Sequence, residues 1–167
     1  MFRITCLLLV FTSILLGCGN IKTETSEIEV VAKADGPFYA GSNSLISNVN
    51  LNLDEILAGI DFKEVVKVTI DGISIQLEGS DEVGFEMFSS AVIQLVSDKS
   101  PMTIVAIHNP ITTTDNKLKL TVSDDAEVTT FFQEGKFSLL LDLDFKEDSY
   151  SQQLDAKVKV NLKIEYK

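Results

Sequence analysis

The sequence predicts an all-β protein, a two-layer antiparallel β-sandwich of immunoglobulin-like size with seven or eight strands and two short crossover helices. Three observations support this fold class. Apolar and polar residues alternate with a period of two beyond residue 27, turn signals recur at short intervals, and helix signals are confined to two short segments. A lipocalin-like barrel is the alternative, because it requires the same alternation.

The C-terminal part has the clearest alternation. In residues 158–166 every second side chain is apolar, and the positions between them are mostly lysine, asparagine and glutamate. Residues 137–145 show the same period. If these two segments form an antiparallel hairpin, Asp142 and Asp144 on the outer face lie opposite lysines of the last strand and form cross-strand charge pairs.

The remaining strands are predicted from weaker or less regular patterns. Residues 28–32, 45–51 and 118–122 alternate, whereas residues 91–96 and 102–107 are nearly continuous apolar runs. Continuous runs predict strands that are covered on both faces. The apolar positions of residues 66–70 and 73–77 flank Asp71-Gly72, which predicts a hairpin with a type I′ turn. One long strand with a bulge at Gly72 is the alternative.

Two short helices are predicted from their end signals rather than from their length. The first covers residues 53–58, where Asn52 and Glu55 are placed for a capping box and Gly59 ends the helix. The second covers residues 124–134 and has the same three signals in Asp124, Glu127 and Gly135. We expect both helices to connect strands at the ends of the sheet.

Residues 1–17 differ from the rest of the chain, because Arg3 is followed by an uncharged apolar run over residues 4–17. A helix over this run would be about 21 Å long, short of the roughly 30 Å hydrocarbon core, which favours a signal peptide over a spanning segment. The run ends in Leu15-Leu16-Gly17-Cys18, which resembles the lipobox of bacterial lipoproteins. This resemblance implies cleavage before Cys18, a diacylglyceryl group on its thiol and acylation of the new amino terminus. Residues 136–143 are similar in pattern to the closing hairpins of small β-sandwich lipoproteins, which implies no activity.

These features divide the chain into a signal peptide (1–17), a lipidated tether (18–26) and a β-sandwich domain (27–167). With Cys6 in the signal peptide and Cys18 acylated, no thiol is left for disulfides or cysteine-ligated zinc. Loss of Arg3 leaves 13 basic and 25 acidic residues, so the mature net charge is 13 − 25 = −12, which argues against nucleic-acid binding. We expect attachment through Cys18 to a bacterial membrane, the outer membrane of a Gram-negative cell, on its periplasmic or its surface side.

The search for catalytic groups returns one candidate base. His108, the single histidine, precedes Asn109-Pro110 at the end of an apolar run, where we expect a structural position at the rim of the fold. The sequence has no Gly-x-Ser-x-Gly, phosphate-binding glycine loop or His-Glu-x-x-His motif. We therefore predict that the protein is not an enzyme and needs no cofactor or metal.

Carboxylates are the remaining source of chemistry. They occur in four pairs, Asp81-Glu82, Asp124-Asp125, Asp142 with Asp144, and Glu147-Asp148. Acidic loops can supply the oxygen ligands that calcium prefers, but so acidic a chain produces such pairs by chance, and a solvated acidic surface is the favoured interpretation. A carboxylate hydrolase is a third hypothesis, which requires a cleft that holds two acids.

Aromatic residues mark two further positions. Residues 36–41 place Phe38 and Tyr39 between turn formers, where they either present a ligand-stacking surface or cap the core. In Phe131-Phe132 we expect one core residue and one half-exposed neighbour. These observations predict a non-enzymatic, membrane-tethered module that binds an envelope protein or polysaccharide or scaffolds an envelope assembly. A calcium-dependent adhesion or lipid-binding β-sandwich is the alternative.

Overall fold

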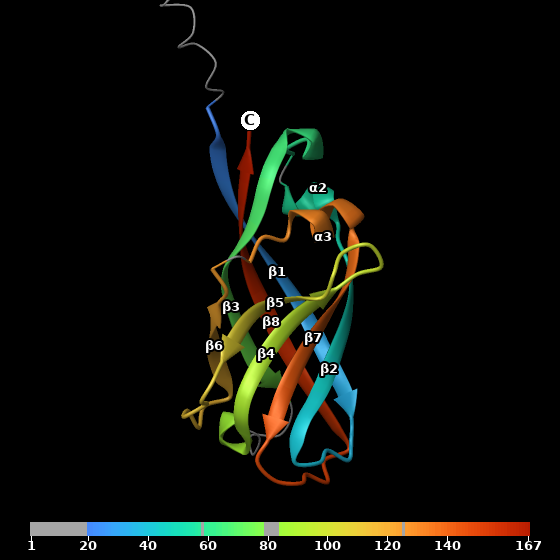
Figure 1. The fold of residues 1–167 in the computed structure, drawn as a ribbon, viewed down its shortest axis with the longest axis vertical. Coiled ribbons are helices and arrows are strands. Elements are labelled where there is room, and N and C mark those ends of the chain that lie inside the picture. The colour runs from blue at the N-terminus through green and yellow to red at the C-terminus, as the bar shows by residue number, and fades with distance from the viewer. Residues whose placement is uncertain (1–19, 58, 79–83, 125) are drawn as a thin grey trace, which may run out of the picture.

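The computed structural model describes residues 20–167 except residues 58, 79–83 and 125. Within this part eight antiparallel strands close into a β-barrel, with two short α-helices near one end (Figure 1). The order around the barrel is β1-β2-β7-β4-β5-β6-β3-β8, and β8 closes onto β1. The strands are β1 (Lys22–Asp35), β2 (Gly41–Asn50), β3 (Val65–Glu78), β4 (Phe88–Val96), β5 (Thr103–His108), β6 (Lys117–Val122), β7 (Lys136–Phe145) and β8 (Gln153–Tyr166).

The predicted two-layer sandwich is wrong, although the chain is all-β. β8 pairs along its length with β1 on one side and with β3 on the other, and β7 pairs with both β2 and β4. The pairs β1–β2, β4–β5, β5–β6 and β3–β6 complete the ring, so no boundary separates two sheets. Side chains alternate in a sandwich and in a barrel alike, and the pattern therefore could not distinguish them. The strand order also differs from that of a lipocalin-like up-and-down barrel, in which consecutive strands pair throughout.

The predicted hairpin between residues 137–145 and 158–166 is also wrong, because β7 and β8 are not neighbours in the barrel. Asp142 of β7 lies opposite Ser44 of β2 and Val92 of β4. The lysines of β8 instead face strands β1 and β3. Alternation determines which face of a strand is buried. It does not determine which other strands lie beside that strand.

The structure decides between the two interpretations of Asp71-Gly72. β3 continues through both residues as one strand, and its register against β8 shifts between Ile70 and Gly72. The predicted type I′ hairpin is therefore wrong, and the bulge is the arrangement found. β1 likewise begins at Lys22, so that residues 22–26, which we assigned to the tether, are paired with β8.

The two apolar runs are buried on one face only. In β4, Ala91, Ile93 and Leu95 are buried, whereas the residues between them are partly exposed. In β5, Ile104 and Ile107 are 47% and 41% exposed. The prediction that both strands are covered on both faces is wrong, because each forms part of a single barrel wall with solvent outside.

Both helices are shorter than predicted. Helix α2 covers Leu53–Ile56, and α3 covers Thr129–Glu134 and ends at Gly135, whose φ of 70° is left-handed. Neither has a side-chain cap at its N-terminus. Glu127 pairs with Thr69 of β3 before α3 begins, which explains why that helix starts late.

Phenylalanine rings and aliphatic side chains fill the barrel. The ring of Phe145 lies 4.6 Å from that of Phe88, edge to face, and 5.1 Å from that of Phe38, stacked. Phe131 and Phe132 are both buried, contrary to the prediction of one half-exposed ring, since α3 packs over the end of the core. An interior void lined by these side chains has a volume of about 10 Å³, which is too small for any ligand larger than a water molecule.

Removal of the central ring of this cluster tests the packing. Phe145→Ala is expected to lower the free energy of unfolding by about 3–5 kcal/mol, because both ring contacts are lost and a cavity is left. Tyr150→Ala, at a position 84% exposed, is the control and should change it by less than about 0.5 kcal/mol. Urea unfolding measures both. Similar losses in the two variants would contradict the packing described.

Candidate functional site

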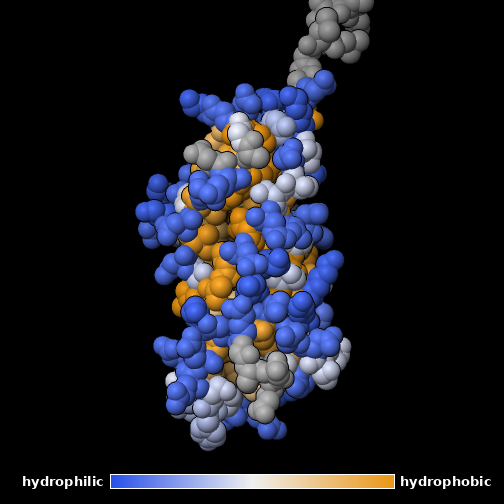
Figure 2. All heavy atoms as spheres, turned by 180° about the vertical axis from the view of Figure 1, so that it is seen from behind, coloured by the Kyte–Doolittle hydropathy of each residue, from blue (hydrophilic) through white to orange (hydrophobic). Residues whose placement is uncertain are grey.

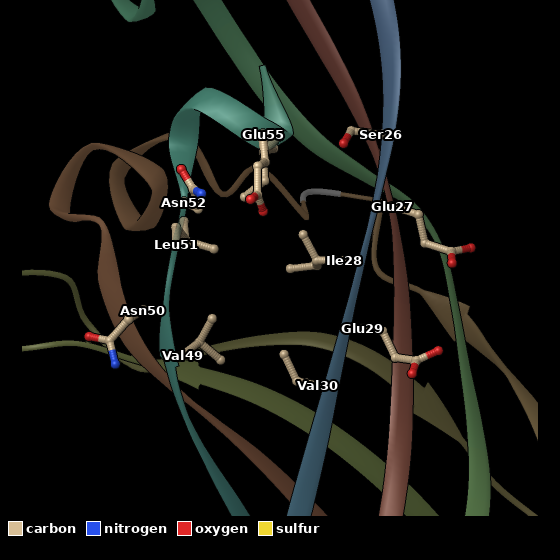
Figure 3. A pocket seen from close by; sticks show the side chains of 11 residues that line it. Ser26, Glu27, Ile28, Glu29, Val30, Val49, Asn50, Leu51, Asn52 and Glu55 are labelled. Atoms are coloured by element: carbon tan, nitrogen blue, oxygen red, sulfur yellow. The ribbon is translucent and has the colours of Figure 1, made fainter. Parts of the chain in front are cut away.

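The candidate site is a cleft between β1 and β2. These strands are neighbours in the barrel, yet they share a single register pair, Lys33 with Ile46. From that pair toward α2 the strands diverge, and the space between them is a cleft of about 320 Å³ (Figure 3). Because the barrel interior is filled, a ligand fits at the surface, as in this cleft, rather than in the lumen.

The floor of the cleft is apolar. Ile28 and Val30 of β1 and Val49 and Leu51 on the β2 side point toward one another across the space (Figure 3). Val49 is buried, and the other three side chains are partly buried against the core. Ile28 also borders the interior void, so the floor is continuous with the barrel core. The alternation of β1 places these residues inward and the glutamates between them outward.

The rim is polar and includes the residues that the sequence analysis assigned to a helix cap. Asn52 precedes α2 without a side-chain cap hydrogen bond, and Glu55 is exposed on the helix. Both line the cleft together with Ser26 and Asn50 (Figure 3). The predicted capping box is therefore not formed. The polar groups at this helix start were recognisable in the sequence, but the side chains face the neighbouring strand instead of the helix backbone.

The backbone at the cleft has unused pairing capacity. β1 pairs with β8 from Lys22 to Asp35, but on its other edge it meets β2 at Lys33 alone. Successive residues of a strand direct their N–H and C=O groups to alternate edges. In the stretch from residue 22 to residue 31, every second residue therefore presents both groups to this edge without a partner in β2, and residues 26–30 of the stretch line the cleft.

A ladder of opposite charges covers the outside of β1, β8 and β3. Lys159 Nζ lies 3.3 Å from carboxylate oxygens of Glu27 and Glu29, and Lys157 Nζ lies 3.3 Å from those of Glu29 and Glu78. Partial burial by itself raises the pKa of Glu29, but hydrogen bonds from Lys159 and Lys157 outweigh it, so the pKa is lowered. Figure 2, seen from behind, shows hydrophilic side chains around hydrophobic areas of this side. The ladder holds β1 against β8 and so fixes one wall of the cleft.

The strand carboxylates that we considered as ligands bind neighbouring strands. Asp142 accepts hydrogen bonds from Ser44 of β2 and Gln94 of β4. Asp144 accepts one from Ser89, with 2.6 Å between Oγ and Oδ2. These two side chains therefore attach β7 to both of its neighbours, and the predicted pairing with lysines of the last strand is wrong.

The loop carboxylates do not gather into one site. Asp148 Oδ1 accepts a hydrogen bond of 2.8 Å from the backbone N–H of Ala40, and Asp124 is exposed on its own loop. Among the residues that the structure describes, no group of three or more acidic, histidine or cysteine side chains is placed to hold a metal ion. Glu147 is exposed, and Asp81, Glu82 and Asp125 lie outside the described residues.

The other predicted positions lie away from the cleft. His108 ends β5 half-buried, opposite Ala91. Phe38 is buried against Phe145 and caps the core, whereas Tyr39 beside it is 63% exposed. Cys18, the predicted lipid attachment site, lies outside the described residues. Across residues 20–167, wherever the chain is described, no helix has both the length and the hydropathy needed to cross a membrane.

Comparisons with known proteins show no family. No protein-family model matches the sequence, and no curated protein matches it. Among solved structures, the chain is similar to one in "Structure of Turnip Yellow Mosaic Virus at 100 K", with 11% identity and a TM-score of 0.35 over 89% of this chain and 95% of that one. It is also similar to one in "Crystal structure of decameric BFDV Capsid Protein", with 9% identity and a TM-score of 0.40 over 89% and 99%. Likeness at this level implies no shared function.

The open edge of β1 makes a prediction for amide hydrogen exchange. In the ligand-free protein, every second amide between Lys22 and Val31 is expected to exchange quickly, because it has no acceptor in β2. The amides between them bond to β8 and should be protected. Exchange followed residue by residue by NMR measures this difference. Equal protection of both sets would contradict the open edge.

The ion pair between Lys33 of β1 and Asp155 of β8 makes a prediction for the pH dependence of stability. A hydrogen bond from Lys33, 2.6 Å long, lowers the pKa of Asp155 below its ordinary 3.8 against the raising effect of burial, and Gln153 assists. The stability this pair provides is present above that ordinary value and is lost as the pH falls through the lowered pKa. As the pH is lowered from about 6 to about 3, the free energy of unfolding should therefore fall less in Asp155→Asn than in the unmodified protein. Urea unfolding at each pH measures this.

Lys33→Met provides the companion variant for this measurement. It removes the main cause of the lowered pKa, so it should weaken the pH dependence in the same direction. Combining the two substitutions should change the pH dependence little further, because both remove the same interaction. Full retention of the pH dependence in Asp155→Asn would show that this carboxylate does not contribute.

Proposed function

We propose that this protein is a lipid-anchored, non-enzymatic binding module of the bacterial cell envelope that takes its ligand in the cleft between β1 and β2. The observation that supports this most directly is the cleft itself, with apolar residues on its floor, polar residues on its rim and one strand edge open. Ligand sites combine an apolar lining with a few polar groups in this manner. The filled barrel interior supports a surface site over a lumenal one.

The predicted anchor places this cleft near a membrane. Ser26, at the rim, follows Cys18 by 26 − 18 = 8 residues. Eight residues span at most about 29 Å, so a lipid on Cys18 keeps the cleft within that distance of the bilayer surface. The start of β1, the C-terminus and α2 lie at the same end of the barrel (Figure 1). A ligand of the cleft would therefore be met beside the membrane that carries the anchor.

The chemistry of the rim supports binding rather than hydrolysis. A carboxylate hydrolase needs one acid whose pKa is raised, so that it is protonated at neutral pH. Glu29 has a lowered pKa, and Glu27 is paired with Lys159. Glu55 stands on the other side of the cleft, on α2. Two of the three acids that line the cleft are thus engaged by lysines of β8.

Cross-linking in cells tests the site. A photoreactive amino acid in place of Glu55, an exposed residue whose side chain points over the cleft, is expected to give a discrete adduct. The same amino acid in place of Tyr150, which is 84% exposed and lies in the loop between β7 and β8, is the control and should give none. Figure 1 shows this loop at the other end of the barrel. An adduct at Tyr150 alone, or none at either position, would overturn the assignment of ligand binding to the cleft.

Partition between detergent and water, measured on the same cells, tests the anchor. The unmodified chain should enter the detergent phase, because two or three acyl chains hold a protein to a bilayer almost irreversibly. Cys18→Ser should enter the aqueous phase. Recovery of the unmodified chain from the aqueous phase would overturn the proposed anchor. It would not affect the cross-linking result, which tests the cleft alone.

A further inference from the structure

We infer that the ligand of the cleft is an extended peptide segment of a partner protein, which adds a strand along the open edge of β1. This inference rests on the proposed function and specifies its ligand class. Four features carry it: the unpaired backbone, the rigid setting of both strands, the spacing of the floor residues and the absence of aromatic residues in the lining.

The backbone supplies the binding groups. An open strand edge is a template for another strand, since its N–H and C=O groups are already spaced for a ladder. From residue 22 to residue 31, β1 has such an edge, and residues 26–30 of it line the cleft. A peptide that pairs there would satisfy these groups by main-chain hydrogen bonds, which do not depend on the peptide sequence.

The two strands beside the cleft are held in place from behind. β1 is in register with β8 over all of Lys22–Asp35, and β2 with β7 over all of Gly41–Asn50. The ion pairs of Glu27 and Glu29 with Lys159 add to the first pairing. Because the edge is positioned before a ligand arrives, little ordering of this protein opposes binding.

The side chains of the floor select the residues of the peptide. Ile28 and Val30 are two positions apart on β1, which is the spacing of inward side chains on an added strand. Every second residue of the peptide would therefore be apolar. The residues between them would face outward beside Glu55, which has no ion pair among the described residues, and beside Glu27 and Glu29, which share Lys157 and Lys159 of β8. Basic side chains are favoured there, chiefly by Glu55. The expected ligand is a segment in which apolar and basic residues alternate.

The composition of the lining favours a peptide over a glycan. Sugar rings are bound on aromatic faces, but none of the described residues that line the cleft is aromatic. A second copy of this chain is disfavoured as the occupant, because each copy has a net charge of −11 before processing and would bring acids to an acidic rim. If the ligand is a glycan, the cross-linking experiment at Glu55 would give a glycan adduct instead of a protein adduct.

Synthetic heptapeptides of alternating residues test the inference on the folded domain, residues 19–167. The probes are acetylated, amidated peptides with lysine at odd positions and valine, leucine or phenylalanine at even positions. At least one is expected to bind, and its binding should weaken at least about tenfold when the N–H groups that face β1 are N-methylated, since every second N–H points to the same edge. N-methylation at the odd and at the even positions is tested separately.

Two further measurements locate the bound peptide. Its addition should protect the fast-exchanging amides of β1 between Lys22 and Val31. Val30→Asp places a charge on the floor and should abolish binding, whereas Val66→Asp, the same change at a 43% exposed position of β3, should not. The exchange measurement uses the unmodified protein, so it decides the question even if Val30→Asp fails to fold.

The outcomes separate this inference from the proposed function. Failure of all three peptides to bind, or binding that neither N-methylation pattern weakens, would overturn strand addition. A glycan adduct at Glu55 in the cross-linking experiment would overturn it too, while the cleft would remain a binding site. Absence of any adduct at Glu55 combined with absence of peptide binding would overturn both.

Discussion

The barrel depends on the two ladders of β8. This strand pairs with β1 over fourteen residues on one edge and with β3 on the other, and it carries the lysines that join the glutamates of both neighbours. Since β7 similarly joins β2 and β4, the ring has two well-paired halves. Their junction at β1 and β2 consists of one register pair. The cleft lies at this sparsely paired junction.

The end of β2 contributes to the open junction. β1 has 14 residues and β2 has 10. After Asn50 the chain turns into α2, and Leu51 donates its N–H to the carbonyl of Gly135 instead of to β1. β2 thus ends its contribution to the sheet, while β1 continues along β8 toward its start at Lys22. Beyond Asn50 the edge of β1 has no strand beside it, and opposite residues 47–50 β2 stays with β7 and does not pair with β1.

The sequence predicted the local structure better than the arrangement in space. Alternation located the buried faces of β7 and β8 correctly, because burial of one face is a property of a single strand. It could not predict that β8 lies beside β1 and β3, since many pairings bury the same faces. The cleft was missed for the same reason. Asn52 and Glu55 were noticed as capping residues, but their place at the rim depends on β1, which is distant in sequence.

An open strand edge is also a hazard, and the chain limits it with charge. Unpaired edges promote pairing between identical molecules unless charged residues interrupt them. On β1, Glu24, Glu27 and Glu29 interrupt the apolar positions, and the whole chain is strongly acidic, so two copies repel each other. The same charges do not repel a basic segment. A single feature, acidic residues along an open edge, therefore disfavours self-association and favours a basic partner strand, and this selectivity argues that the edge is retained for binding.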